Sequence, residues 1–196
     1  MLTPRDDGSM VSDTPVMLPV MAPRLQGDVL PDGAVDLSLW GVGRLGRVRF
    51  SALAGPYAYA PNRVVGRSGG IYLAQSAPVM LVRGGGAARV FPARRCAWWH
   101  EIAAEDAKPA WRATADGRSM ELPWGVLQLG QRGDDLLLSV GVDAAEASRA
   151  MRLAAAEIVA EAEAHVRRCD LMPGADPLLR TMVLQGVHAA LSSIRA

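Results

Sequence analysis

The stretch GVLQLGQRGDDLLLSVGVDAAEA, residues 125–147, decides how the chain is organised. Its two runs GVLQLGQ and DLLLSVGV have the length and apolar content of β-strands, and the turn-forming QRGDD segment joins them. Directly afterwards, Asp143 and Glu146 have the D-x-x-E spacing of a helix start. The stretch therefore predicts a β-hairpin that is followed by a helix.

Towards the N-terminus, short strand-like runs continue back to about Ala34, among them VDLSLW, RVRFSAL, GIYLAQ, VMLVR, AWWHEIA and RSMELPW. Turn-forming residues separate the runs, and Asp116-Gly117 is the clearest hairpin signal. Short strands at hairpin spacing are typical of a sandwich rather than of alternating βαβ units. We therefore expect a mainly β fold with C-terminal α structure: an antiparallel β-sandwich over residues 34–142, followed by two helices. Residues 1–33, which are rich in Pro, Asp and Gly, are expected to form a loose N-terminal arm.

The two expected helices differ in character. Residues 143–170 predict a single linker helix with a narrow apolar stripe and charged flanks. Residues 175–196 predict a second helix, with Asp176 as its N-cap and Pro177 at its first position, and its body is almost wholly apolar. Such a helix requires cover on most sides. We expect Leu184, Val187 and Leu191 to be covered by the rest of a longer protein, by a second copy of the chain or by a fold-back onto the sandwich.

The overall composition favours a globular, cytoplasmic protein. Half of the residues are hydrophobic (50%), and the formal net charge is only +1. The two cysteines, Cys96 and Cys169, are too few for a disulfide framework. The start MLTPRDDGSMVSDTP does not resemble a signal peptide, and Pro19 and Pro23 interrupt the apolar segment that follows, so we expect no membrane partner.

Arginine is concentrated in one part of the chain. Residues 37–100 contain no Asp or Glu, and nine arginines fall within them. Such a face could bind phosphate groups or another anion. The alternative is that acidic residues elsewhere pair with these arginines and cancel their field, so nucleic acid is not the expected partner. The candidate anion contacts are Arg47, Arg49, Arg94 and Arg95.

Adjacent tryptophans mark a second candidate site. Trp98 and Trp99 precede His100 and Glu101 in a run that we interpret as one strand. Neighbouring side chains of a strand point to opposite faces, so one indole faces outward or into an interface. An outward indole could stack on a sugar ring. These four residues are the candidate carbohydrate contacts.

Two further motifs favour ordinary structural interpretations. GVGRLG at 41–46 matches the G-x-G-x-x-G dinucleotide fingerprint, but the strand-like RVRFSAL follows it where a helix is required, so we expect no nucleotide cofactor. Cys96 with His100, and His165 with Cys169, have metal-ligand spacing. The second pair could chelate from one helix, but on a single strand the first pair would lie about 13 Å apart. We therefore expect no metal site, no cofactor and no catalytic residue within the chain.

The order of the parts resembles a known family. A β-sandwich, a charged linker helix, a Pro/Gly break and a buried helix occur in this order at the start of bacterial amylo-α-1,6-glucosidase (glycogen-debranching-type) glycoside hydrolases. In that family an (α/α)6 barrel follows. DPLLRTMVLQGVHAALSSIR is similar to a first barrel helix, and LPWGVLQL with LLLSVGVDAAEA is similar to the closing strands of the sandwich.

The resemblance implies that the catalytic carboxylates lie in the barrel, beyond these residues. We therefore expect a non-catalytic N-terminal domain of a glycosidase, whose partner is the rest of the parent protein or a second copy through residues 175–196. Two alternatives remain. One is a small dimeric binding protein with an arginine-rich face for an anionic ligand or nucleic acid, and the other is a stand-alone carbohydrate-binding module.

Overall fold

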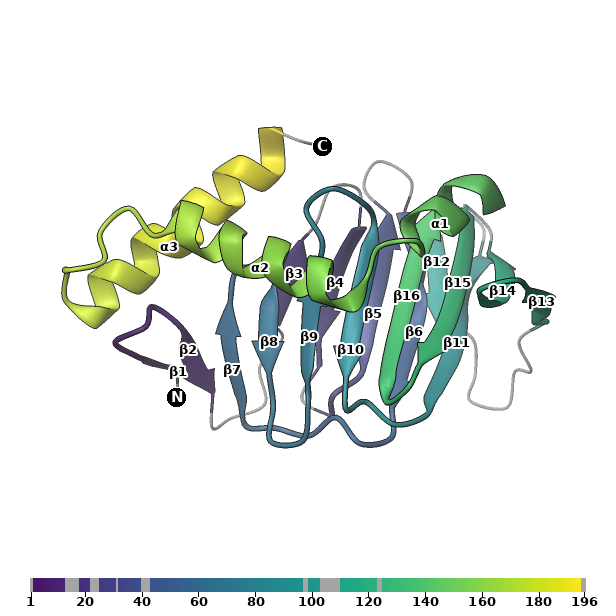
Figure 1. Ribbon diagram of the computed structural model, residues 1–196, viewed down its shortest axis with the longest axis horizontal. Coiled ribbons are helices and arrows are strands. Elements are labelled where there is room, and N and C mark those ends of the chain that lie inside the picture. Colours follow the sequence, from purple (N-terminus) through teal and green to yellow (C-terminus); the bar gives the residue numbers. More distant parts are fainter. Residues whose placement is uncertain are drawn as a thin grey trace.

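The chain folds into two antiparallel sheets that are flanked by helices, as the computed structural model in Figure 1 shows. The structure describes residues 2–12, 18–21, 25–30, 32–39, 43–96, 99–102, 110–122 and 125–194. Within these residues, the larger sheet has ten strands in the order β1-β2-β7-β8-β9-β10-β16-β15-β14-β13, and the smaller has six in the order β12-β11-β6-β5-β4-β3. The predicted β-sandwich followed by helices is therefore confirmed.

Most strands are short and join their sequence neighbours. The larger sheet contains β1 (Leu2–Pro4), β2 (Met10–Ser12), β7 (Tyr57–Ala60), β8 (Arg63–Val65), β9 (Gly70–Leu73), β10 (Val79–Arg83), β13 (Arg112–Thr114), β14 (Gly117–Leu122), β15 (Gly125–Arg132) and β16 (Asp135–Gly141). The smaller sheet contains β3 (Leu18–Met21), β4 (Leu25–Val29), β5 (Val35–Leu39), β6 (Gly43–Phe50), β11 (Ala88–Cys96) and β12 (Trp99–Ile102).

The main core lies between the two sheets. In β4 and β5, every second residue is buried, so Leu25, Val29 and Leu37 point inward while Asp28 and Asp36 lie on the outer face. Ile71, Leu127 and Leu138 of the larger sheet belong to the same cluster. Each fully buried side chain of this size stabilises the fold by about 1.5–3 kcal/mol relative to its exposed state.

The central strands β10 and β16 are buried on both faces. Leu136, Leu138 and Val140 belong to the core between the sheets, whereas Leu137 packs with Leu81 under the helices. Strands that are covered on both faces read as continuous apolar runs, which accounts for VMLVR and LLLSV in the sequence. The predicted turn at Asp116-Gly117 is also confirmed, because Thr114 pairs with Gly117 in the β13–β14 hairpin.

The predicted linker helix is two helices rather than one. α1 (Ala144–Ala150) starts as expected, with Asp143 accepting a hydrogen bond from the backbone N–H of Glu146. It ends at Ala150, and α2 (Ala155–Cys169) begins after four intervening residues. The single helix over 143–170 is therefore wrong.

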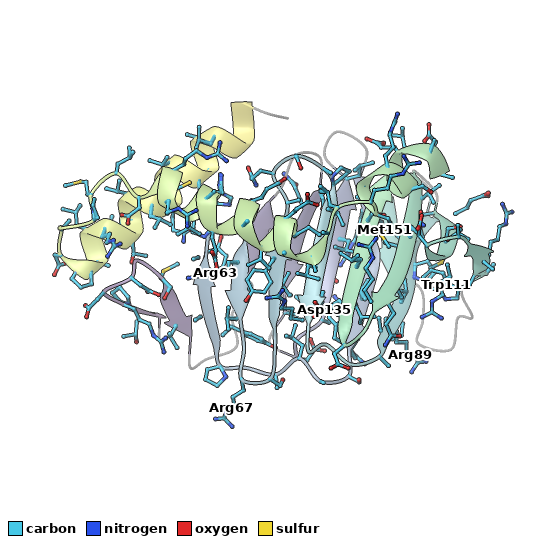
Figure 2. All side chains as sticks on the ribbon, in the orientation of Figure 1. Arg63, Arg67, Arg89, Trp111, Asp135 and Met151 are labelled. Atoms are coloured by element: carbon cyan, nitrogen blue, oxygen red, sulfur yellow. The ribbon has the colours of Figure 1, made fainter. Side chains whose placement is uncertain are left out.

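A contact with the sheet explains this break. Arg132 at the end of β15 donates hydrogen bonds to the carbonyl oxygens of Met151 (2.6 Å) and Leu153 (3.1 Å). Carbonyls at a helix end require such donors because the helix no longer supplies them. Met151, labelled in Figure 2, is fully buried, and its Cε lies 2.5 Å from where a Cβ on Gly130 would stand. The chain turns at this anchored side chain.

After the break, α2 crosses the outer face of the larger sheet over β9 and β10 (Figure 1). Ile158 packs in the same hydrophobic cluster as Leu81 and Leu137, beneath the helices. Glu161 accepts hydrogen bonds from the backbone N–H groups of Gln75 and Ser76. α3 (Pro177–Ile194) then turns back beside α2, and Asp176 caps it through the N–H of Leu178 as predicted. α2 therefore sits on the side of the larger sheet that faces away from the core, and α3 packs on α2 and on β1 at the edge of that sheet.

The expectation of a loose arm over residues 1–33 is wrong for the part that the structure describes. β1 and β2 form a hairpin at one edge of the larger sheet, and β4 lies inside the smaller sheet with Leu25 and Val29 fully buried. The hairpin also contacts α3: Arg180 donates to the carbonyl oxygen of Asp6. Pro, Asp and Gly in this segment form tight turns, as at Gly8 with φ of 79°, rather than an unstructured arm.

α3 has two faces with different surroundings. Leu184 is fully buried, and its Cδ1 lies 3.0 Å from where a Cβ on Gly8 would stand, so the hairpin covers it. Val187 and Leu191 are half-buried. Of the three ways in which this helix was expected to be covered, the structure shows one for Leu184, which is a fold-back onto the same chain. The opposite face of α3 remains exposed.

Candidate functional site

The described part of GVGRLG, residues 43–46, belongs to the smaller sheet. From Gly43 onward these residues form β6, so a strand stands where a dinucleotide site requires a helix. Gly46 pairs with Leu37 on one side and Pro92 on the other, and a Cβ there would lie 2.6 Å from the carbonyl oxygen of Phe91. This glycine permits close approach of β11 rather than of a phosphate.

The candidate anion contacts Arg47 and Arg49 are paired with acids. Arg47 donates two hydrogen bonds to Asp36, at 2.5 and 3.0 Å, and Arg44 donates to the same carboxylate. Arg49 lies 3.3 Å from Asp32. Burial acts to raise the pKa of Asp36, but the hydrogen bonds from Arg47 and the charge of Arg44 together lower it. The carboxylate is thus ionised at neutral pH and offsets the field of this face.

Other arginines of the acid-free segment also have partners. Arg63 lies 3.9 Å from Asp7, and Arg83 lies 3.5 Å from Asp135. Arg89 lies with its guanidinium carbon 5.0 Å from the ring centre of Phe91. The acids come from β5, its preceding turn, the β1–β2 hairpin and β16. The arginine-rich segment therefore lies within a mixed-charge surface.

The tryptophan site is only partly described. Trp98 lies outside the described residues, and for Trp99, His100, Glu101, Arg94 and Arg95 the structure describes the backbone alone. The backbone corrects the single strand that was expected to carry both Cys96 and His100. β11 ends at Cys96 and β12 begins at Trp99, and the register pairs Arg94 with Glu101 and Arg95 with His100. Cys96 and His100 therefore lie on two paired strands, and the separation of about 13 Å expected on a single strand does not hold for them.

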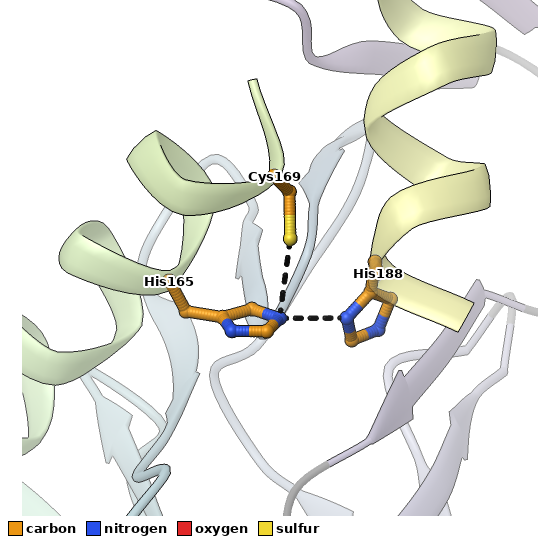
Figure 3. Close-up of side chains that lie close together, drawn as sticks. All are labelled: His165, Cys169 and His188. Atoms are coloured by element: carbon orange, nitrogen blue, oxygen red, sulfur yellow. Dashed lines mark hydrogen bonds between the residues drawn. The ribbon is translucent and has the colours of Figure 1, made fainter. Parts of the chain in front are cut away.

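A different constellation converges between the last two helices (Figure 3). His165 and Cys169 lie on successive turns of α2, and His188 reaches them from α3. The Nε2 atom of His165 lies 2.8 Å from Nδ1 of His188 and 3.5 Å from Sγ of Cys169. These three ligand atoms all lie within 4.8 Å of one another. They are the group of potential metal ligands found in the described part of the chain.

The cluster is buried, and burial keeps His188 and Cys169 uncharged at neutral pH. His165, Cys169 and His188 are all buried. Burial lowers the pKa of His188 to about 4 and raises that of the Cys169 thiol to about 11. Neutral imidazole is the form that binds metals, whereas a thiol must lose its proton to do so. His188 could therefore bind a metal ion through nitrogen without losing a proton, whereas Cys169 would have to release its thiol proton to bind one through sulfur.

The local sequence explains how the three side chains meet. Ile158, Ala162, His165 and Cys169 recur at spacings of four and three and form the buried stripe of α2. On α3, Thr181, Leu184 and His188 recur in the same way. Arg180 locks the two helices by donating to Asp170, with Nη2 2.5 Å and Nε 3.1 Å from its carboxylate oxygens. The turn between the helices thus brings two histidine-bearing stripes together.

Sequence reasoning identified the His165–Cys169 pair but missed His188. The available signal was a single histidine in an almost wholly apolar helix that directly follows a helix with a chelating pair. Its significance depends on how α3 folds back on α2, which spacing along the chain does not give. We expected no metal site because Cys96 and His100 were placed too far apart to share an ion. That expectation left out His188 as a third ligand beside His165 and Cys169.

Comparison of the chain with protein-family models, with curated proteins and with solved structures gives no match. Among the described helices, none combines the length and the apolar character that a membrane crossing requires.

Proposed function

We propose that this chain is the non-catalytic β-sandwich domain of a glycoside hydrolase acting on α-glucans or related carbohydrates, and that it supports a helical catalytic barrel through α3. The observation that carries the proposal is the outer face of α3. Leu178 and Met182 are 57% and 63% exposed, and Leu179 beside them is 45% exposed. Large apolar side chains at such exposure on one helix face are typical of a contact surface.

The same face continues with small residues. Gly186, Ala189 and Ala190 are exposed one and two turns beyond Met182. A Cβ on Gly186 would meet no atom within 4 Å. Large residues followed by small ones on one face let a second helix approach closely, since packed helix axes lie about 8–10 Å apart. A helical partner therefore fits this face better than a strand edge does.

The charge of α3 also favours an apolar protein partner. Arg180 is the sole charged residue of Pro177–Ile194, and its guanidinium is bonded to Asp170 and Asp6. A surface that binds nucleic acid requires several cations to neutralise phosphates. The exposed face of α3 offers no such set of cations, so we assign it to a contact with another protein domain.

Several of the described carboxylates have structural contacts rather than the pairing that catalysis requires. Glu146, Glu157 and Glu161 accept hydrogen bonds from backbone N–H groups, Asp143 and Asp176 cap helices, and Asp36 and Asp170 bind arginines. Glycosidic hydrolysis requires two carboxyl groups that flank a substrate cleft. These acids instead hold the fold together, which agrees with catalysis by another domain.

The test is an activity comparison. The product of the full-length natural gene and the chain of residues 1–196 are each assayed for sugar release from maltooligosaccharides and from α-1,6-branched glucan. The proposal predicts hydrolysis by the gene product and none by residues 1–196. Hydrolysis by residues 1–196 alone, or a natural gene that ends at Ala196, contradicts it. A dimer of residues 1–196 that Met182→Glu dissociates would assign the α3 face to a second copy.

A further inference from the structure

Two of the three donor-atom distances between α2 and α3 are close to those of a tetrahedral metal site, and the third is at most 4.8 Å. With zinc bonds of about 2.0–2.1 Å to nitrogen and about 2.3 Å to sulfur, ligand atoms lie about 3.6 Å apart for N–S pairs and about 3.3 Å apart for N–N pairs. Sγ of Cys169 and Nε2 of His165 are 3.5 Å apart, so this pair already fits. The nitrogens of His165 and His188 are 2.8 Å apart and would separate by roughly 0.5 Å.

The two imidazole rings also point in suitable directions. Their planes meet at 75° with centroids 5.1 Å apart, and the nearest atoms are ring nitrogens. Lone pairs of imidazole lie in the ring plane, so both rings direct a nitrogen at the same small volume, where the thiol of Cys169 also ends (Figure 3). A shift of His188 alone opens this volume for an ion, because His165 and Cys169 are fixed by one helix.

The donor set selects a class of metal. Two nitrogens and one sulfur suit zinc and cobalt, whereas calcium and magnesium require oxygen ligands. We propose that His165, Cys169 and His188 bind a zinc-class divalent cation that joins α2 to α3. The three protein donors leave one position of a tetrahedral ion for water or another oxygen donor.

The position of the site indicates a structural role. All three ligands are buried, and the ion would lie between the helices, beyond the Arg180–Asp170 contact that already ties their near ends. Bound metal would fix the angle of α3 against α2 and hence the direction of its exposed face. The metal site stands on this geometry alone and does not depend on the proposed glycosidase role.

The test is cobalt binding by the intact chain. The protein is freed of metal with a chelator, which is then removed, and Co²⁺ is titrated while the thiolate-to-cobalt absorption band in the near ultraviolet is recorded. The proposal predicts one cobalt per chain, a strong band, and its loss when zinc is added. Two ligand variants, Cys169→Ser and His188→Gln, should each weaken binding by at least about 100-fold and should remove or reduce the band.

The chain supplies a matched control. Cys96 and His100 are the other cysteine and the remaining histidine, so Cys96→Ser/His100→Gln keeps the ligand cluster and should bind cobalt as the unsubstituted chain does. Circular dichroism of each metal-free variant checks that it is folded. The titration of the unsubstituted chain decides the matter even if a variant fails to fold. Absence of the band there, or a band that follows Cys96 and His100, overturns the proposal.

Discussion

His165 on α2 and His188 on α3 meet edge to face inside the protein, with 2.8 Å between Nε2 of the first and Nδ1 of the second. One nitrogen must donate a proton and the other must accept it, so the accepting ring must be neutral. Burial lowers the pKa of His188 to about 4, which keeps that ring neutral over the ordinary pH range. The joint between the two helices is therefore sensitive to acid.

The first prediction concerns pH. In the metal-free protein, the free energy of unfolding should fall as pH drops from about 6.5 towards 4, by up to about 3 kcal/mol. Between these values the unfolded chain binds a proton at His188 and the folded chain does not, so acid favours unfolding. Urea unfolding with a chelator present, at pH 7 and pH 5, measures the effect.

The control for this prediction is His188→Gln, which cannot take up the proton. Its free energy of unfolding should change less over the same range. Asp7 and Asp36 do not obscure the comparison, since their pKa values are lowered from 3.8 and their contribution is lost only at more acidic pH. Identical pH profiles for the two proteins would show that His188 does not control acid sensitivity.

The second prediction concerns Gly8. Its φ of 79° and the 3.0 Å between an added Cβ and Leu184 Cδ1 both disfavour a side chain. Gly8→Ala should destabilise the protein by about 1–2 kcal/mol, because the hairpin loses its fit against α3. Gly174→Ala is the control, since a Cβ there meets no atom within 4 Å, and it should cost less than about 0.5 kcal/mol. Equal urea midpoints for the two variants would contradict the role of the hairpin as an anchor.

The third prediction concerns the paired acids of the smaller sheet. Asp36→Asn removes the charge that offsets Arg44 and Arg47, so it should lower stability by about 1 kcal/mol and increase binding of short DNA at low salt. Asp28 faces Asp36 across the β4–β5 ladder, and burial together with the charge of Asp36 raises its pKa. Asp28→Asn should therefore cost little stability. Unchanged DNA binding by Asp36→Asn would mean that these arginines are neutralised in some other way.

Local signals in the sequence predicted much of the fold. Asp143 with Glu146, Asp116-Gly117 and Asp176-Pro177 each determine structure within a few residues, and all three behave as expected. The features that sequence reasoning missed depend on distant contacts. α1 ends where Arg132, about 20 residues earlier, binds the carbonyls of the residues that follow the helix, and Arg180, near the other end of the chain, holds the β1–β2 hairpin. His188 likewise gains its significance from the fold-back of α3.

The most direct test of the proposed role is Met182→Glu in two proteins. Met182 is 63% exposed, so in residues 1–196 the substitution should leave the melting temperature unchanged. In the full-length gene product the same carboxylate would be buried against the helical barrel, at a cost of about 2–4 kcal/mol, and should lower both the melting temperature and the glucan hydrolysis rate. Ala160→Glu, at an exposed position of α2, should be neutral in both. If Met182→Glu were as neutral as Ala160→Glu in the full-length protein, the α3 face would not be a domain contact.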